Sequence, residues 1–189
     1  MLLNLWFALF TLTAFSQTSE HLSLKSVPVD GTLDQFVSRM KQNGFTLLVA
    51  ENGFATLKGD FAGYKECVVS VSTLDKKDLV YKTGVAFPGK STWSDLSGNY
   101  FELKSMLTQK YGEPPVVYEK FQSTSEPDDD LSKMSQVSQN NCKYYAIWIT
   151  DKGTIQLLID HRSLEKFVKL VYLDKVNGDV IKAKAIDDL

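Results

Sequence analysis

The feature that most limits the fold of this chain is a series of short strand-like runs joined by hairpin signals. The clearest signal separates residues 45–50 from residues 54–59, where Glu51-Asn52-Gly53 stands between two apolar runs. Asn-Gly favours the positive φ angles of a tight hairpin turn, so the segment predicts two paired strands. Asp151-Lys152-Gly153 suits a three-residue hairpin loop with glycine in the left-handed position. These turns favour antiparallel pairing.

One helix is expected ahead of each run of strands. Apolar residues recur at helical spacing in 33–40, with Thr32 as the expected N-cap and Gly44 as the stop. The same spacing recurs in 100–111, which Gly112 and two prolines end. The expected strands are 45–50, 54–59, 67–74, 79–87, 116–121, 142–150, 154–160 and 166–174, with a short extended segment at 22–29 and a weak helix at 179–189.

This order predicts an α+β fold with antiparallel sheet and helices packed on one face. It also suggests two tandem helix-plus-four-strand units within one compact domain, at about 22–93 and 94–189. The stretch 122–141 is polar and rich in serine, and we expect it to be a long exposed loop.

The first residues have the pattern of a secretory signal peptide. Residues 2–15 hold no charge and form an apolar run too short for a helix that crosses a membrane. Ala14-Phe15-Ser16 fits the small-x-small cleavage pattern, so cleavage is expected between Ser16 and Gln17. The amino end lacks Lys and Arg, and the alternative is a buried N-terminal helix or strand. We expect an exported protein, periplasmic or extracellular, that runs from residue 17 to 189 with no transmembrane segment.

Export changes the meaning of the two later cysteines, Cys67 and Cys142. In an oxidising compartment they form a disulfide candidate, which would close a long loop; the alternative is two separate core thiols. The charge balance does not favour polyanionic partners, because the chain has 21 basic and 23 acidic residues. Nucleic acid is therefore not an expected partner.

Gly84 to Ser91 reads GVAFPGKS and satisfies the phosphate-binding pattern GxxxxGK[ST]. Its first half reads as the end of an antiparallel strand rather than as an open loop, so we interpret the match as coincidental. The acidic run 128–130 lacks the spacing of a calcium loop. We expect no cofactor and no metal site.

Catalytic constellations are equally weak. His21 and His161 are the only histidines, and a Cys142–His161 or Ser–His161 pair has no local support. We therefore assign no catalytic residues. The strand 142–150 is apolar on both faces, with Tyr144 and Trp148 on one side and Tyr145 on the other, which favours a central strand covered on both sides over an aromatic binding platform.

Three segments resemble small uncharacterised secreted proteins of Bacteroidetes-type bacteria: the leader ending at Gln17, residues 27–36 (VPVDGTLDQF) and residues 59–64 (GDFAGY). The tandem arrangement is similar to β-lactamase-inhibitor-protein-like folds, which implies protein binding through a sheet face. No inhibitory residue matches. The expected function is an exported, non-catalytic binding or interaction module for a protein or glycan, with a secreted hydrolase or a structural component of the cell envelope as alternatives.

Overall fold

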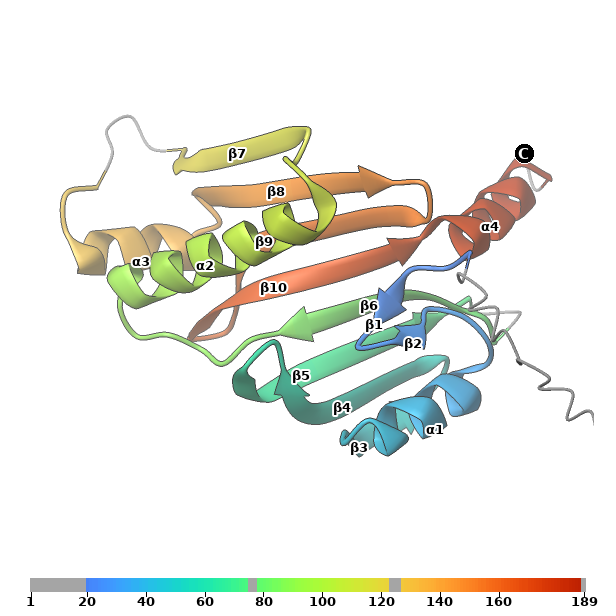
Figure 1. Cartoon of the computed structure of the whole chain (residues 1–189). Helices are drawn as coiled ribbons and strands as arrows, with labels where there is room; N and C mark the ends of the chain where they lie inside the picture. The colour runs from blue at the N-terminus through green and yellow to red at the C-terminus, as the bar shows by residue number, and fades with distance from the viewer. Residues whose placement is uncertain (1–19, 75–77, 123–126, 188–189) are drawn as a thin grey trace, which may run out of the picture.

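The structure is a computed structural model that describes residues 20–74, 78–122 and 127–187. These residues form an eight-stranded antiparallel sheet, a two-stranded ribbon and four helices, which confirms the α+β prediction (Figure 1). The elements are β1 (Ser23–Leu24), β2 (Val27–Pro28), α1 (Leu33–Gln42), β3 (Thr46–Glu51), β4 (Phe54–Phe61), β5 (Tyr64–Thr73), β6 (Val80–Ala86), α2 (Trp93–Tyr111), β7 (Val116–Phe121), α3 (Asp130–Ser138), β8 (Cys142–Thr150), β9 (Gly153–Arg162), β10 (Glu165–Asp174) and α4 (Lys175–Asp187).

The large sheet joins two runs of four consecutive strands side by side. Its order is β3-β4-β5-β6-β10-β9-β8-β7. We call α1 with β3–β6 the N-terminal unit and α2 with β7–β10 the C-terminal unit. The last strands of the two units, β6 and β10, pair with each other at the centre, where Val85 lies opposite Leu170. The predicted tandem units therefore share one continuous sheet.

Local signals act as predicted in the N-terminal unit. The Thr32 side chain accepts a hydrogen bond from the backbone of Gln35, and the Gln35 side chain accepts one from the backbone of Thr32, a reciprocal capping box. Asn52 and Gly53 take φ angles of 47° and 74°, as the hairpin between β3 and β4 requires. Both the helix and the hairpin are confirmed.

The predicted loop at 122–141 is wrong in part, because α3 lies within it. The Asp129 carboxylate accepts a hydrogen bond from the backbone N–H of Ser132 at 2.8 Å and so caps the helix. Met134 and Val137, three residues apart, bury their side chains in the core. The sequence signal was present in this capping aspartate and apolar pair, but the surrounding polar residues masked it.

The helices α1, α2 and α3 lie on one face of the sheet. Among the strands of the large sheet, α1 contacts β3, β4 and β5, while α2 and α3 contact β8, β9 and β10 (Figure 1). Strand residues that point to this face form the core, as Ile155, Leu157 and Ile159 of β9 do. We call the opposite face of the large sheet the open face, because α1, α2 and α3 all lie on the other one; α4 contacts β6, β9 and β10 where it follows the end of β10.

A buried polar cluster ties the start of the described chain to the end of the sheet. Asp174 is 2% exposed and accepts hydrogen bonds from the backbone N–H groups of Leu22 (2.9 Å) and Asn177 (3.0 Å). His21 Nδ1 lies 3.0 Å from Asp174 Oδ1, the oxygen that also accepts from the Asn177 backbone. The Asn177 side chain donates in turn to the Val80 carbonyl at 2.8 Å. One carboxylate thus caps α4 and anchors the segment before β1.

The candidate disulfide is not formed: Cys67 and Cys142 are both free and buried. Cys67 lies in β5 and Cys142 in β8, and three strands separate them in the sheet. At about 4.8 Å per strand spacing, this is well beyond the reach of a disulfide, whose Cα atoms lie within about 7 Å. Of the two alternatives, the structure has two separate core thiols.

Candidate functional site

Strand register determines which side chains reach the open face. Tyr118 of β7 lies opposite Tyr145 of β8, which lies opposite Leu158 of β9. The same row continues across β10 through Lys169, which lies opposite Ala86 of β6. Because side chains alternate between faces along each strand, residues two apart from these share the open face.

The C-terminal unit carries a continuous apolar surface on this face. Tyr118 and Tyr145 stack with ring centroids 5.8 Å apart and planes 10° apart. Val116 is 39% exposed and Ile149 is 68% exposed, while the other members are half-buried. We call this surface the tyrosine patch; it consists of Val116, Tyr118, Tyr145, Ile147, Ile149 and Leu158.

The N-terminal unit has a different open face. Its central positions are small or polar, as at Ser70 and Ser72 of β5 and at Thr56 of β4. The exposed apolar side chains here are Leu48, Val49 and Phe54, and they lie on the two outer strands, β3 and β4. The C-terminal half of the open face differs in that its apolar residues span three strands and include a stacked pair of aromatic rings.

A hollow of about 300 Å³ lies between the two halves, over the junction of β6 and β10. Gly84 and Ser70 are on its floor, and a Cβ on Gly84 would lie only 2.9 Å from the Ser70 hydroxyl. Phe167 lines the hollow and is 6% exposed although it lies outside the helix-side core. We call this depression the junction hollow; it gives the open face relief beside the tyrosine patch.

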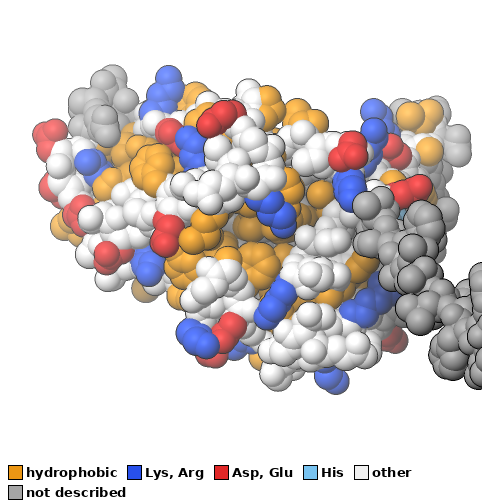
Figure 2. Space-filling model, viewed as in Figure 1, with side chains coloured by type: hydrophobic (Ala, Val, Ile, Leu, Met, Phe, Trp, Pro, Cys, Tyr) orange, Lys and Arg blue, Asp and Glu red, His pale blue; other side chains and the backbone are white. Residues whose placement is uncertain are grey.

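Apolar atoms also reach the surface on the helix side (Figure 2). Phe101 and Met106 of α2 are 46% and 43% exposed. The Phe101 ring, however, packs edge-on against the Tyr100 ring, with centroids 5.3 Å apart. Single exposed apolar residues of this kind are ordinary, whereas a patch spread over three strands is not.

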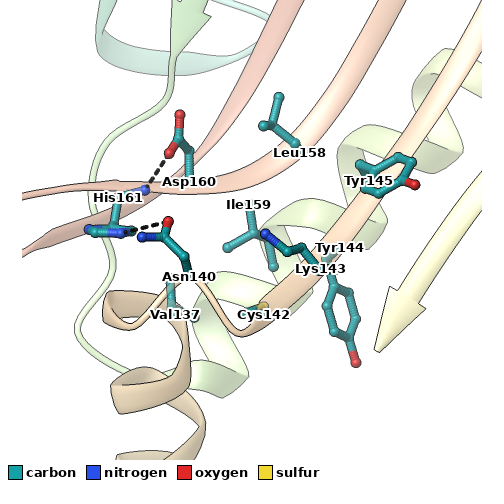
Figure 3. A pocket seen from close by; sticks show the side chains of 10 residues that line it. All are labelled: Val137, Asn140, Cys142, Lys143, Tyr144, Tyr145, Leu158, Ile159, Asp160 and His161. Atoms are coloured by element: carbon teal, nitrogen blue, oxygen red, sulfur yellow. Dashed lines mark hydrogen bonds between the residues drawn. The ribbon is translucent and has the colours of Figure 1, made fainter. Parts of the chain in front are cut away.

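A second depression, of about 270 Å³, gathers several residues that the sequence raised for catalysis (Figure 3). Cys142, Asp160 and His161 all line it. His161 Nε2 lies 3.2 Å from Asn140 Oδ1, and in the view of Figure 3 Asn140 lies between the His161 ring and Cys142. The structure thus brings these residues near one another without a hydrogen bond between His161 and Cys142 in the described chain.

The chemistry of these groups does not suit nucleophilic catalysis. Burial raises the pKa of the Cys142 thiol to about 12, so the thiol stays neutral near pH 7, whereas the thiolate is the nucleophile. The Asp160 carboxylate accepts hydrogen bonds from Lys169 Nζ (3.1 Å) and from the backbone N–H of His161 (2.8 Å). It therefore does not orient the His161 ring as the third member of a triad would.

The phosphate-loop-like motif does not form a loop around an anion site. Gly84 and the next two residues lie inside β6, paired on both sides. Farther along, Lys90 forms an isolated bridge with Lys166. The glycine-rich loop between a strand and a helix that the motif requires is therefore missing at residues 84–91.

The acidic run has structural roles. Asp129 caps α3, and hydrogen bonds from Ser132 lower its pKa. Asp130 accepts a hydrogen bond from the backbone N–H of Trp93 at 3.1 Å and so links α3 to the start of α2. Within the described residues no group of three or more His, Cys, Asp or Glu could hold a metal ion.

The sequence interpretation of strand 142–150 is half right. Trp148 is 1% exposed and its indole N–H donates to the Gly112 carbonyl at 2.8 Å, so that face is core. The other face is not covered, because Tyr145 and Ile149 belong to the tyrosine patch. Alternation in the sequence identified the two faces, but it did not show which of them a helix covers.

Sequence reasoning missed the contribution of Tyr118 and the junction hollow, since both depend on strand order. The expected leader and its cleavage site at Ser16 and Gln17 lie outside the described residues. In the described part of the chain, no helix combines the length and apolar character needed to cross a membrane.

Comparison with known proteins adds no relative. No protein-family model matches this sequence. Neither curated proteins nor solved structures give a match to the chain.

Proposed function

We propose that this protein is an exported, non-catalytic binding module that engages a protein partner through the tyrosine patch. The observation that carries the proposal is the patch itself, where stacked Tyr118 and Tyr145 adjoin the exposed Ile149 on a sheet face without a helix. Large exposed apolar patches with polar surroundings mark interaction sites, and tyrosine is enriched at their energetic centres. Export rests on the leader pattern of the sequence.

Two further features support binding over catalysis. The residues nearest to a catalytic grouping, Cys142 and His161, are not hydrogen-bonded to each other in the described chain, and burial keeps the thiol protonated. The junction hollow beside the patch offers a recess for a projecting side chain of a partner. A sheet face that is already ordered loses little conformational entropy when a partner binds, which favours affinity.

Site-specific crosslinking in the native host tests the proposal. A photoreactive amino acid at Ile149 is expected to capture one partner, and Tyr145→Ser in the same chain is expected to abolish that product. Leu131 and Leu164 are matched control positions, because they are apolar and even more exposed, at 82% and 88%, but lie away from the patch. Equal capture from Ile149 and from the controls would contradict the proposal, as would capture that ignores Tyr145→Ser.

A further inference from the structure

Two lysines beside the tyrosine patch form a cross-strand pair of like charge, which is unfavourable for the stability of the sheet. Lys120 of β7 lies directly opposite Lys143 of β8, and both side chains share the open face. Like charges directly opposite each other on a sheet destabilise it. Neither lysine forms an ion pair within the described residues, although Lys120 Nζ lies 4.9 Å from the Tyr118 ring centroid.

The corresponding corner of the N-terminal unit avoids this repulsion. Lys58 of β4 lies opposite the neutral Thr46, and Glu66 of β5 forms an ion pair with Lys58. Near Lys143 the available acid is Asp160, but Lys169 engages it at 3.1 Å. The cationic pair is therefore a specific feature of the C-terminal unit.

Protection of the sheet edge explains only half of the pair. Lysine on an edge strand such as β7 deters edge-to-edge aggregation. Lys143, however, lies on β8, an inner strand, where it protects no edge. The pair also runs against the overall composition, in which acidic residues outnumber basic ones by 23 to 21. Local conflicts with stability of this kind are expected at functional sites.

We propose that the partner is an acidic protein segment that places a carboxylate between Lys120 and Lys143 and an apolar side chain on Tyr118 and Tyr145. This inference rests on the proposed function and specifies its partner. A carboxylate there would offset the repulsion of the two ammonium groups, and their field would steer an acidic partner toward the patch. Within the described residues no acid forms an ion pair with either lysine, and a bound carboxylate would compensate their charge.

Peptide selection on the full chain identifies the preferred chemistry. Random peptides displayed on phage and selected on the protein are expected to yield a consensus of Asp or Glu next to an aromatic or aliphatic residue. A synthetic consensus peptide is then the probe in titration calorimetry. Its affinity is expected to fall at least about tenfold in the variant K120E/K143E, and to fall with salt as the Debye length shrinks from about 8 Å to about 3 Å.

A charge swap gives the decisive arm. A peptide with Lys in place of the consensus acid is expected to bind K120E/K143E more tightly than it binds the unchanged protein. Lys41→Glu is the matched control, since Lys41 is exposed on α1 and outside the open face. Lys143→Gln is expected to raise the urea midpoint of unfolding while it weakens binding, a pair of opposite signs that a purely structural lysine would not produce.

The outcomes separate the two proposals. A neutral or basic consensus that loses binding with Tyr145→Ser but ignores the lysine variants would overturn the acidic partner and leave the proposed function standing. Binding that ignores Tyr145→Ser would overturn both. Self-association in sedimentation equilibrium that Ile149→Ser abolishes would make a second copy the occupant and overturn the acidic partner.

Discussion

The two four-stranded units have the same arrangement of strands, but their surfaces on the open face differ. Each is an antiparallel meander with helices on one face, α1 in the N-terminal unit and α2 with α3 in the C-terminal unit. Each also contributes its last strand to the central β6–β10 pair. On the open face, the N-terminal unit presents Thr56 and Ser70, while the C-terminal unit presents Tyr118 and Tyr145. Position in the fold therefore does not determine the chemistry of an outward-facing residue, because the core constrains only the inward-facing half of each strand.

The largest expected effects on the free energy of unfolding come from substitutions in the core that the two units share. Trp148→Ala in the C-terminal unit and Phe36→Ala in the N-terminal unit each remove a buried side chain, and each is expected to lower the free energy of unfolding by about 4 kcal/mol. Since β6 and β10 join the units, both variants should unfold in one transition.

Urea unfolding followed by two probes checks this. In the chain from residue 17 onward the tryptophans are Trp93 and Trp148, and both lie in the C-terminal unit. With that chain, tryptophan fluorescence reports on the C-terminal unit and far-ultraviolet circular dichroism on the whole. For Phe36→Ala the two midpoints should coincide. A fluorescence midpoint that stays at the wild-type value while the dichroism midpoint falls would show that the units unfold separately.

A somewhat smaller effect is expected at the clamp between the two ends of the fold. Asp174→Ala removes the acceptor of two backbone N–H groups and of His21, and is expected to cost about 3 kcal/mol of unfolding free energy. Asp160→Ala is the control, because its ion pair with Lys169 is partly exposed and should contribute less than about 1 kcal/mol. Equal losses in denaturant titrations would contradict the role of the clamp.

Each unit contains one buried cysteine, whose thiol titrates only at alkaline pH. Burial raises the pKa of Cys67 to about 11 and that of Cys142 to about 12. Their contribution to stability is fully present below the unfolded pKa of about 8.5 and is lost as pH rises toward the folded values, by about 1 kcal/mol per thiol near pH 9.5.

Unfolding free energy measured against pH up to about 9.5, below the titration of tyrosine, tests this, with Cys67→Ala/Cys142→Ala as the control that should reduce the decline in that range. Mass spectrometry after alkylation supplies an independent check. We expect no modification of the folded chain near pH 7 and two modified thiols after unfolding in denaturant without reductant. Resistance to alkylation in denaturant would instead reveal a bridge and contradict the structure.

The smallest expected change in unfolding free energy is for an outward-facing residue, and it is compared with that of an inward-facing one. Ile149→Ser on the tyrosine patch is expected to change the unfolding free energy by less than about 0.5 kcal/mol. Ile155→Ser on the core face of β9 is the matched variant, and it should cost several times more because Ile155 is fully buried. A large loss for Ile149→Ser would indicate that the open face is needed for folding rather than for binding.

Local chemistry in the sequence determined much of the fold. The capping box of Thr32, the hairpin at Asn52-Gly53 and the alternation along β8 and β9 act over a few residues, so the sequence alone predicted the helix, the turn and the strands. The helix α3 was missed because its apolar pair, Met134 and Val137, is too short a pattern to stand out in a polar stretch.

Tertiary structure alone decided the rest, because the candidate site depends on which strands become neighbours. Sequence alternation separated Tyr145 from Trp148, but only the pairing of β7 with β8 brought Tyr118 onto Tyr145 and Lys120 opposite Lys143. The same strand order placed Cys67 and Cys142 too far apart for a bridge. Short-range propensities determine elements, whereas the order of strands in a sheet is set by long-range packing, and the surface proposed to bind a partner belongs to that second level.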